Sequence, residues 1–336
     1  MLGDIGIRTG GNCLALLLCV CSPAPQARAK QTPPDQAQRS TADSVASVGP
    51  YFGQEPPGMV PEVFAPDILS RVQPEWAFCA EFGPDLDEFY FSRTDVERNI
   101  DQILVMRREN DNWSAPEVAS FNAPYDTHDS RISPDGRLMF FRSRRPLPGN
   151  SGPEEAYYAW FAERNRDGWS APQPVLCDGA PLRTGHLGIS GLGRIYFSQR
   201  SAQNVGEADI YRAMFHDGAC TAPENLGPIV NTRYLEGDAY ISPDERMLIV
   251  SVWNRPENSG DSDLYISYRH ADGSWSPLTN LGDPINTFRN ENCATLSPDG
   301  KYFFYVGVDA REERAKIDTY WVDARILDRH RTASHP

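Results

Sequence analysis

Short apolar and aromatic runs recur along the chain, each preceded by a polar turn sequence related to Ser-Pro-Asp-Gly. The five phrases are EFGPDLDEFYFSR (81–93), SRISPDGRLMFFRS (130–143), GISGLGRIYFSQR (188–200), AYISPDERMLIVS (239–251) and ATLSPDGKYFFYV (294–306). Their turns begin 50 to 57 residues apart, at Gly83, Ser133, Ser190, Ser242 and Ser297. A Pro-Asp-Gly turn between two apolar strands is typical of a tight β-hairpin. The pattern therefore predicts five β-rich repeats.

Each repeat continues with phrases that predict two further strands. An aspartate opens the third strand at Asp209, Asp263 and Asp318, and its recurrence indicates a structural bond made once per repeat. The common position of the fourth-strand phrase is occupied by Trp113, Trp169, Cys220 and Trp275. We expect these four side chains to pack between neighbouring repeats. Each repeat then holds four antiparallel strands, which is one blade of a β-propeller.

The fifth repeat lacks a fourth strand, and the beginning of the chain offers a match for it. MVPEVFAPDIL (59–69) resembles the fourth-strand phrase SAPEVASFNAP (114–124). We predict that 59–69 completes the last blade, which joins the two ends of the ring and protects its strand edges. The predicted fold is an all-β, five-bladed propeller over residues 49–336, with four antiparallel strands per blade.

The repeats also resemble a known family. Ser-Pro-Asp-Gly before an aromatic strand, followed by Asp-(Ile/Leu)-Tyr, is similar to the WD40-like repeat of TolB-type periplasmic proteins. The resemblance covers residues 59–327 and implies a propeller. It implies no single activity, because such repeats occur in scaffolds, peptidase-gating propellers and oligosaccharide-cleaving lyases. The third repeat departs from the pattern, since SGLG stands where Pro-Asp is expected.

The first residues predict export. CLALLLCVCS (13–22) is apolar but too short to span a bilayer as a helix. Ala27 and Ala29 fit the small-residue pattern of a signal-peptide cleavage site. We therefore predict a signal peptide over 1–29, a flexible linker over 30–48, and a periplasmic or secreted protein without a transmembrane segment.

The net charge and the cysteines restrict the possible binding partners and indicate where disulfides can form. A net charge of −14 argues against nucleic-acid binding, because phosphate backbones repel an acidic chain. In an oxidising compartment the cysteines that follow the signal peptide can pair. Cys79 and Cys293 occupy equivalent places on the first strands of neighbouring blades, which fits either a bridge that reinforces ring closure or two free apolar side chains. Cys177 and Cys220 lie on outer strands, and the sequence does not decide whether they meet.

Candidate functional residues gather at one rim of the predicted propeller. The first strand of each blade lines the channel, so polar groups at the starts of these strands converge. The candidate catalytic residues are Glu236, Asp238, Asp129, Glu291 and His128. The candidate ligand-binding residues are Arg233, Arg289, Arg144, Arg200, Arg255 and Tyr234. Crowding of such groups shifts pKa values and permits acid–base chemistry.

Three functions fit this rim. A binding module would hold a saccharide or a peptide through the arginines, with no catalytic residue. A carbohydrate-active enzyme would use opposed carboxylates as a glycoside hydrolase, or a rim histidine as the base of a polysaccharide lyase. A divalent metal ion in the channel would be held by His128 and His186, with Asp129 and Asp238.

We expect ligand binding, with a saccharide or a peptide as the ligand and glycoside cleavage as the alternative. A cell-envelope protein is a further expected partner, and we expect the chain to be monomeric. The sequence does not identify the ligand.

Overall fold

The computed structural model describes residues 48–122, 124–166, 168–311 and 313–331. The described residues all belong to one compact unit, Ser44–Pro336. The predicted signal peptide (1–29) lies outside the described residues, as does the predicted linker (30–48) apart from Val48. Within the described ranges, no helix has the length and apolar character needed to cross a membrane.

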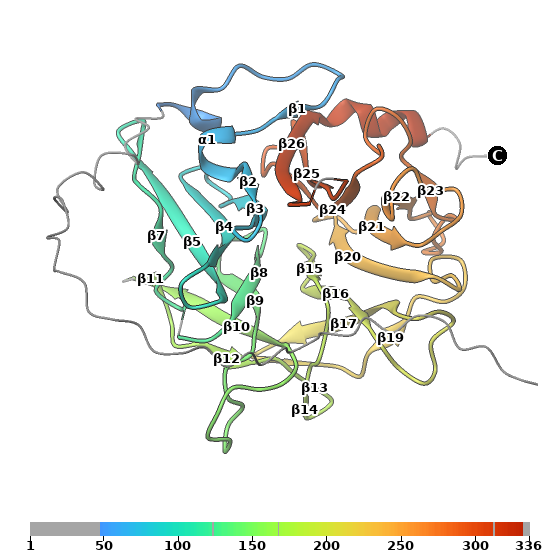
Figure 1. The fold of residues 1–336 in the computed structure, drawn as a ribbon. Helices are drawn as coiled ribbons and strands as arrows, with labels where there is room; N and C mark the ends of the chain where they lie inside the picture. Colours follow the sequence, from blue (N-terminus) through green and yellow to red (C-terminus); the bar gives the residue numbers. More distant parts are fainter. Residues whose placement is uncertain (1–47, 123, 167, 312, 332–336) are drawn as a thin grey trace, which may run out of the picture. The chain divides into compact units, whose positions relative to one another are not determined.

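The described chain is all-β and forms five sheets (Figure 1). Sheet 1 contains β3 (Ala77–Phe82), β4 (Glu88–Asp95), β5 (Ile100–Glu109), β6 (Asn112–Trp113) and β7 (Glu117–Val118). Sheet 2 contains β8 (Thr127–Ile132), β9 (Leu138–Ser143), β10 (Tyr158–Asn165), β11 (Gly168–Trp169) and β12 (Gln173–Pro174). Sheet 3 contains β13 (Leu176–Cys177), β14 (Ala180–Pro181), β15 (Leu187–Ile189), β16 (Arg194–Gln199), β17 (Asp209–His216), β18 (Ala219–Cys220) and β19 (Glu224–Asn225).

The last two sheets and three short helical segments complete the described chain. Sheet 4 contains β20 (Leu235–Ile241), β21 (Met247–Trp253), β22 (Ser262–Tyr268) and β23 (Thr279–Asn280). Sheet 5 contains β24 (Asn290–Leu296), β25 (Tyr302–Asp309) and β26 (Lys316–Asp323), together with the N-terminal strands β1 (Glu62–Val63) and β2 (Arg71–Val72). The helical segments are η2 (Pro50–Gly53), α1 (Pro66–Leu69) and η3 (Ala324–His330).

The first strands of the sheets surround one centre. β3 contacts β8, β8 contacts β15, β15 contacts β20, and β20 contacts β24. β24 in turn contacts β3, so the sheets form a closed, propeller-like ring.

Four sheets match the predicted blade, and one departs from it. Sheets 1, 2, 4 and 5 each follow a path of four neighbouring strands, whereas sheet 3 is extended to seven strands. The extension arises because the hairpin β13–β14 adds to β18 through a parallel pairing of Leu176–Cys177 with Ala219–Cys220. The prediction of five equal, wholly antiparallel blades is therefore confirmed only in part.

Burial explains the continuous apolar runs of the second strands. In β16 the residues Ile195, Tyr196 and Phe197 are all buried, although their side chains alternate between the two faces of the sheet. They join two different apolar clusters, one shared with sheet 2 and the other with sheet 4. A sheet covered on both faces needs apolar residues at successive positions.

The Ser-Pro-Asp-Gly phrase owes its composition to the turn that it forms. The Ser133 hydroxyl donates to Asp135 at 2.5 Å and accepts the Leu138 amide at 2.9 Å, which ties the two strands of the hairpin together. Gly136 has φ 71°, a left-handed conformation that glycine adopts without a steric penalty. The equivalent serine hydroxyls of sheets 4 and 5 also donate to the aspartate two residues further on.

Glu245 occupies the left-handed position of the sheet 4 turn in place of glycine, with φ 56°. Its side chain is buried, and its carboxylate accepts hydrogen bonds from Ser190 at 2.8 Å and from Arg194 at 3.0 Å. Arg269 of sheet 4 donates to the same carboxylate at 2.8 Å. A residue of sheet 4 therefore supplies the acceptor that the irregular SGLG turn of sheet 3 lacks.

The repeated aspartates are structural, as the sequence predicts. Asp209 accepts the amides of Val205 and Gly206 at 2.8 and 3.1 Å and the side-chain amide of Asn225 at 2.7 Å. Asp263 makes the equivalent bonds to Ser259, Gly260 and Asn280. Asp209 and Asp263 thus hold the loops that precede their own strands, whereas Asp318 accepts the Ser70 hydroxyl of the N-terminal segment at 2.5 Å.

The recurrent tryptophans pack between sheets, as predicted. Trp169 donates its indole N–H to the Tyr90 hydroxyl of sheet 1 at 3.0 Å. The Trp275 ring lies 6.5 Å from that of Tyr196 in sheet 3, measured between centroids. Trp113 belongs to a buried cluster shared with sheet 5, and Cys220 to one shared with sheet 2.

The N-terminal segment pairs with the last sheet, as predicted from its match to the fourth-strand phrase. β1 and β2 both pair antiparallel with β26. Phe64 follows β1 and is fully buried, with its ring centroid 5.0 Å from those of Phe304 and Trp321 in sheet 5 and 6.0 Å from that of Phe89 in sheet 1. The segment therefore contributes to the junction between the first and last sheets.

Phe64→Ala should lower the free energy of unfolding by about 3–5 kcal/mol, because it removes a fully buried ring from this junction. Urea denaturation followed by tryptophan fluorescence would measure the change. Val60→Ala is the control, since Val60 lies in the same segment and is 67% exposed; it should shift stability by less than about 0.5 kcal/mol. Equal effects of the two variants would contradict an anchoring role for Phe64.

Candidate functional site

Five equivalent positions face the centre of the ring, four of them on the first strands and one, His186, directly before β15. Each lies four residues before the start of its turn, and they are occupied by Cys79, Asp129, His186, Asp238 and Cys293. At four of them the backbone is left-handed, with φ 49° at Cys79, 57° at Asp129, 45° at Asp238 and 51° at Cys293. The strand register shifts at each of these four places, as in a β-bulge. A bulge re-aims a side chain, and here all five side chains line one pocket.

The four cysteines that follow the predicted signal peptide form two disulfides. The Cys79–Cys293 bridge joins β3 to β24, so the first and last inner strands are covalently linked, which decides between the two alternatives left by the sequence. The Cys177–Cys220 bridge joins β13 to β18 within sheet 3.

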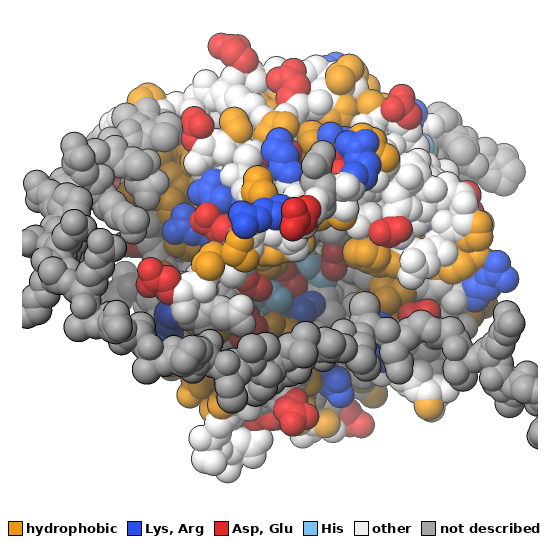
Figure 2. All heavy atoms as spheres, in the orientation of Figure 1, with side chains coloured by type: hydrophobic (Ala, Val, Ile, Leu, Met, Phe, Trp, Pro, Cys, Tyr) orange, Lys and Arg blue, Asp and Glu red, His pale blue; other side chains and the backbone are white. Residues whose placement is uncertain are grey.

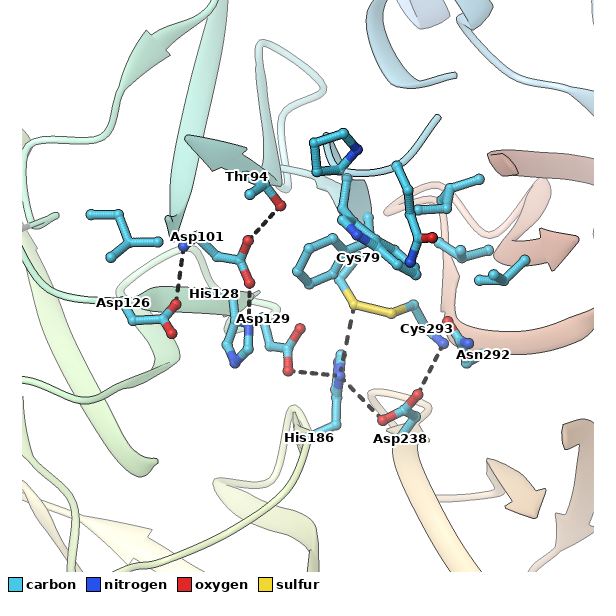
Figure 3. Close-up of a pocket in the computed structure, with 18 of the residues that line it drawn as sticks. Cys79, Thr94, Asp101, Asp126, His128, Asp129, His186, Asp238, Asn292 and Cys293 are labelled. Atoms are coloured by element: carbon cyan, nitrogen blue, oxygen red, sulfur yellow. Dashed lines mark hydrogen bonds and ion pairs between the residues drawn. A yellow bond between two sulfur atoms is a disulfide. The ribbon is translucent and has the colours of Figure 1, made fainter. Parts of the chain in front are cut away.

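The pocket is a cavity of about 830 Å³ among the first strands and the loops around them. The face displayed in Figure 2 is hollowed near its centre, and acidic and histidine side chains are visible inside the hollow. One side of the pocket is apolar and is lined by Trp76, Phe78, Val306, Val308 and Ile317 beside the Cys79–Cys293 bridge. The other side is polar and carries Asp101, Asp126, His128, Asp129, His186 and Asp238 (Figure 3).

The polar side of the pocket is predominantly acidic. Four carboxylates contribute to the described lining, and Arg314 is the one guanidinium among the described lining residues. The field inside such a cavity disfavours an anionic ligand.

His128 is held on both ring nitrogens. Its Nε2 lies 3.1 Å from Arg142, which can only donate, so Nε2 accepts and the proton resides on Nδ1. The Nδ1–H then faces Asp101 at 3.3 Å, and the Asp101 carboxylate also accepts from Thr94 at 2.7 Å. The Tyr157 ring stacks on the imidazole with the centroids 4.6 Å apart. A histidine whose lone pair is occupied by arginine is poorly placed to act as a base.

Asp126 is another acidic group on the polar side of the pocket. Its carboxylate accepts the Asp101 amide at 3.0 Å and the Tyr157 hydroxyl. Asp101, Asp126 and the pocket aromatics Trp76 and Phe78 are not among the residues predicted from the sequence. Their only sequence signal is proximity to strand starts, since none of them occupies a position shared by the repeats.

Asp129 and Asp238 flank the imidazole of His186. The His186 Nδ1 lies 3.6 Å from Asp129 Oδ2 and 3.6 Å from Asp238 Oδ1. Burial lowers the pKa of His186 to about 4, and the two carboxylates oppose the shift only in part. The imidazole is therefore neutral at neutral pH.

Asp129 is an ionised carboxylate. Burial acts to raise its pKa, but the positive charges that His128 and His186 carry when protonated, together with the guanidinium groups of Arg142 and Arg131, act more strongly in the opposite direction. Arg142 lies 3.3 Å from Asp129 Oδ2. The pKa of Asp129 therefore stays below its ordinary value, which excludes this group as a general acid near neutral pH.

The predicted metal ligands are divided between two groups. Cys79, Asp129, His186 and Cys293 have ligand atoms within 4.8 Å of one another, and so do Asp101, Asp126 and His128. The two histidines predicted to share one ion therefore belong to different groups, and Asp238 belongs to neither. Both groups line the same pocket.

Glu236 and Glu291 lie outside this pocket, unlike the other predicted catalytic residues. Both side chains are fully buried, and they accept hydrogen bonds from Thr232 and Thr287 respectively. Burial is the main cause that raises the pKa of Glu236 to about 7 and that of Glu291 to about 8. The two glutamates thus repeat one internal Thr–Glu contact in adjacent sheets.

None of the six predicted ligand-binding residues lines the pocket. Arg144 donates to the Glu154 carbonyl, Arg255 to Glu257, and Arg289 to the Thr287 hydroxyl. Arg233 donates to the neighbouring Tyr234 hydroxyl, and Arg200 is exposed. Four of the five arginines therefore bond to nearby groups, and they do not converge on one ligand position.

Comparisons with known proteins give no assignment. No protein-family model matches the chain. No curated protein matches it. The chain is similar to the structure of a protein of unknown function from Dyadobacter fermentans, at 13% identity and a TM-score of 0.48 over 80% of this chain and 83% of that one.

Two further solved structures are similar to the same degree. One is an alpha-L-arabinofuranosidase from Lactobacillus brevis, at 11% identity and a TM-score of 0.45 over 74% of this chain and 92% of that one. Another is described as a glycoside hydrolase, at 12% identity and a TM-score of 0.45 over 80% of this chain and 93% of that one. Similarities of this size do not assign an activity, and the resemblance to TolB-type repeats stays a prediction.

The raised pKa of Glu291 makes stability depend on pH. The folded state keeps the Glu291 proton up to about pH 8, whereas the unfolded chain releases it near the ordinary value of 4.5. This contribution to stability is complete below about pH 4.5 and is lost as pH rises towards 8. Glu291→Gln should therefore flatten the fall in the free energy of unfolding over this range, measured by urea denaturation at several pH values.

Glu97→Gln is the matched control, because it neutralises an exposed carboxylate. The control should leave the pH profile of the wild type unchanged. A Glu291→Gln profile parallel to the wild-type profile would mean that Glu291 is ionised in the folded protein.

Proposed function

We propose that the pocket binds an uncharged saccharide and that the protein acts as a binding module. The observation that carries the proposal is the division of the pocket into an aromatic side with Trp76 and Phe78 and a side rich in carboxylates. Aromatic rings bury the apolar C–H faces of a sugar, and fixed carboxylates accept hydrogen bonds from its hydroxyls. An excess of carboxylates favours a neutral saccharide over a uronate.

The chemistry of the pocket supports binding over cleavage. Glycoside hydrolysis requires one protonated and one ionised carboxyl group beside the substrate. Asp129 is ionised, and the glutamates whose pKa values are raised, Glu236 and Glu291, lie outside the pocket. A lyase requires a base that reaches the substrate, whereas the Nε2 lone pair of His128 accepts from Arg142 and the side chain of His186 is only 1% exposed.

The sequence resemblance and the ring of sheets support a finer description of the fold. We propose that sheet 3 is an enlarged blade. With the four regular sheets it would make the chain a five-bladed propeller with TolB-type repeats. The two disulfides suit an oxidising compartment, which supports the proposal that the protein is periplasmic or secreted.

Trp76→Ala should weaken saccharide binding at least about tenfold, because an aromatic contact of this kind contributes roughly 1.5–3 kcal/mol. Isothermal titration of residues 30–336 with neutral oligosaccharides, in the presence of a metal chelator, would measure it. Arg200→Ala is the control, because Arg200 is exposed and outside the pocket. Loss of binding in the Arg200 variant alone would move the site to the arginine-bearing rim.

Mass spectrometry of the titrated oligosaccharides tests the alternative of cleavage. We expect intact oligosaccharides after prolonged incubation. Fragments that have gained water would identify a hydrolase, and unsaturated fragments a lyase. Binding of peptides without binding of any neutral saccharide would also overturn the proposal.

A further inference from the structure

We propose that Asp129, His186 and Asp238 form a binding site for a divalent transition-metal ion of the zinc class. The three residues occupy equivalent positions in their repeats: Asp129 lies on β8, His186 directly before β15, and Asp238 on β20. They approach one another at the pocket beside the Cys79–Cys293 bridge (Figure 3). This inference goes beyond saccharide binding, and its test needs no saccharide.

The spacing of the donor atoms fits ligands that share one ion. The His186 Nδ1 lies 3.6 Å from a carboxylate oxygen of Asp129 and 3.6 Å from one of Asp238. These separations are too long for good hydrogen bonds, which are about 2.7–3.2 Å. Two ligands bound tetrahedrally at about 2.0–2.1 Å from an ion lie roughly 3.3–3.5 Å apart. An ion bound at His186 Nδ1 would therefore have one carboxylate of Asp129 and one of Asp238 beside it.

His186 has few other partners. Its side chain is 1% exposed, and its Nε2 has no hydrogen-bond partner among the described residues. Its Nδ1 contacts the Cys79 sulfur at 3.9 Å. Thus neither ring nitrogen has a nitrogen or oxygen partner at hydrogen-bond distance within the described chain, which is unusual for a buried polar group. An ion bound at Nδ1 would give this nitrogen a strong partner.

Outer contacts hold the two carboxylates in place. Arg142 lies 3.3 Å from Asp129 Oδ2, and the Cys293 amide donates to Asp238 Oδ2 at 3.4 Å. The Ser92 hydroxyl accepts the Asp129 amide at 3.0 Å. Metal-binding carboxylates are commonly oriented by such neighbours. Asp238 is 24% exposed towards the pocket, so an ion would reach the site from that side.

The donor set indicates the class of ion. One imidazole and two carboxylates suit Zn²⁺ and its neighbours in the first transition series. Ca²⁺ prefers six to eight oxygen ligands, and Mg²⁺ prefers an octahedral set of oxygens. We therefore expect Zn²⁺ to bind much more tightly than Ca²⁺ or Mg²⁺.

The disulfide determines how many protein ligands are available. With Cys79 and Cys293 joined, their sulfurs are not thiolates, and the ion keeps open positions that face the pocket. A dithiol reductant that supplies two electrons and two protons breaks the S–S bond, giving two thiols and an oxidised dithiol. Zn²⁺ then displaces the thiol protons and gains thiolate ligands. Reduction should therefore tighten zinc binding.

The first experiment titrates the oxidised protein with Zn²⁺ in competition with a chromophoric chelator. We expect one ion per chain, binding at least about tenfold weaker in His186→Ala and in Asp238→Asn, and unchanged binding in His216→Ala. His216 is the matched control, because it is a histidine beside a carboxylate, Asp217, with 82% of its side chain exposed. Circular dichroism would confirm that each variant is folded. Asp238→Asn provides a second test if His186→Ala does not fold.

The second experiment repeats the titration after reduction, in a protein that carries Cys177→Ser and Cys220→Ser so that the other disulfide cannot contribute. Binding should tighten at least about tenfold, and Co²⁺ should show sulfur-to-metal charge-transfer absorption that is absent in the oxidised protein. Adding Cys79→Ser and Cys293→Ser should abolish both changes.

Absence of zinc binding in the oxidised protein, or equal binding by wild type and His186→Ala, would overturn the site. An unchanged affinity after reduction would overturn the role of the disulfide.

Discussion

The closed ring is the constraint on which the rest of the structure depends. A sheet whose second strand is apolar on both faces is stable only when a neighbour covers each face. In an open arc the first and last sheets would each leave one face exposed. Two features close the ring: the pairing of β1 and β2 with β26, and the disulfide between β3 and β24. Closure also creates the pocket, because the five inner strands share one centre only when the ring is complete.

Local chemistry made much of this fold predictable from the sequence. The Ser-Pro-Asp-Gly turn depends on bonds among residues at most five apart, so its pattern is visible without tertiary information. The β13–β14 hairpin is different, because it is held by a parallel pairing and a disulfide to β18, some forty residues away in sequence. Nothing in the residues of 176–181 alone indicates that partner, and the enlargement of sheet 3 was therefore not predicted.

The candidate site was predictable only where the repeats place it. Asp129, His186 and Asp238 occupy shared positions, and the structure brings them together in one pocket. Glu236 lies two residues before Asp238, and simple alternation would place both side chains on one face of the strand. The irregular register between Gly237 and Tyr240 separates them: Asp238 lines the pocket, and Glu236 turns inward to Thr232. A bulge of this kind cannot be located from the sequence pattern.

The contact of Glu245 with Ser190 and Arg194 makes two neighbouring repeats depend on each other. The turn of sheet 3 has no acidic residue of its own, and sheet 4 carries one at a position that ordinarily favours glycine. Without Glu245, the Ser190 hydroxyl and the Arg194 guanidinium would lose this acceptor; without sheet 3, the buried Glu245 carboxylate would keep only its contact with Arg269. Neither repeat can therefore be exchanged for a standard repeat without a loss of stability in its neighbour.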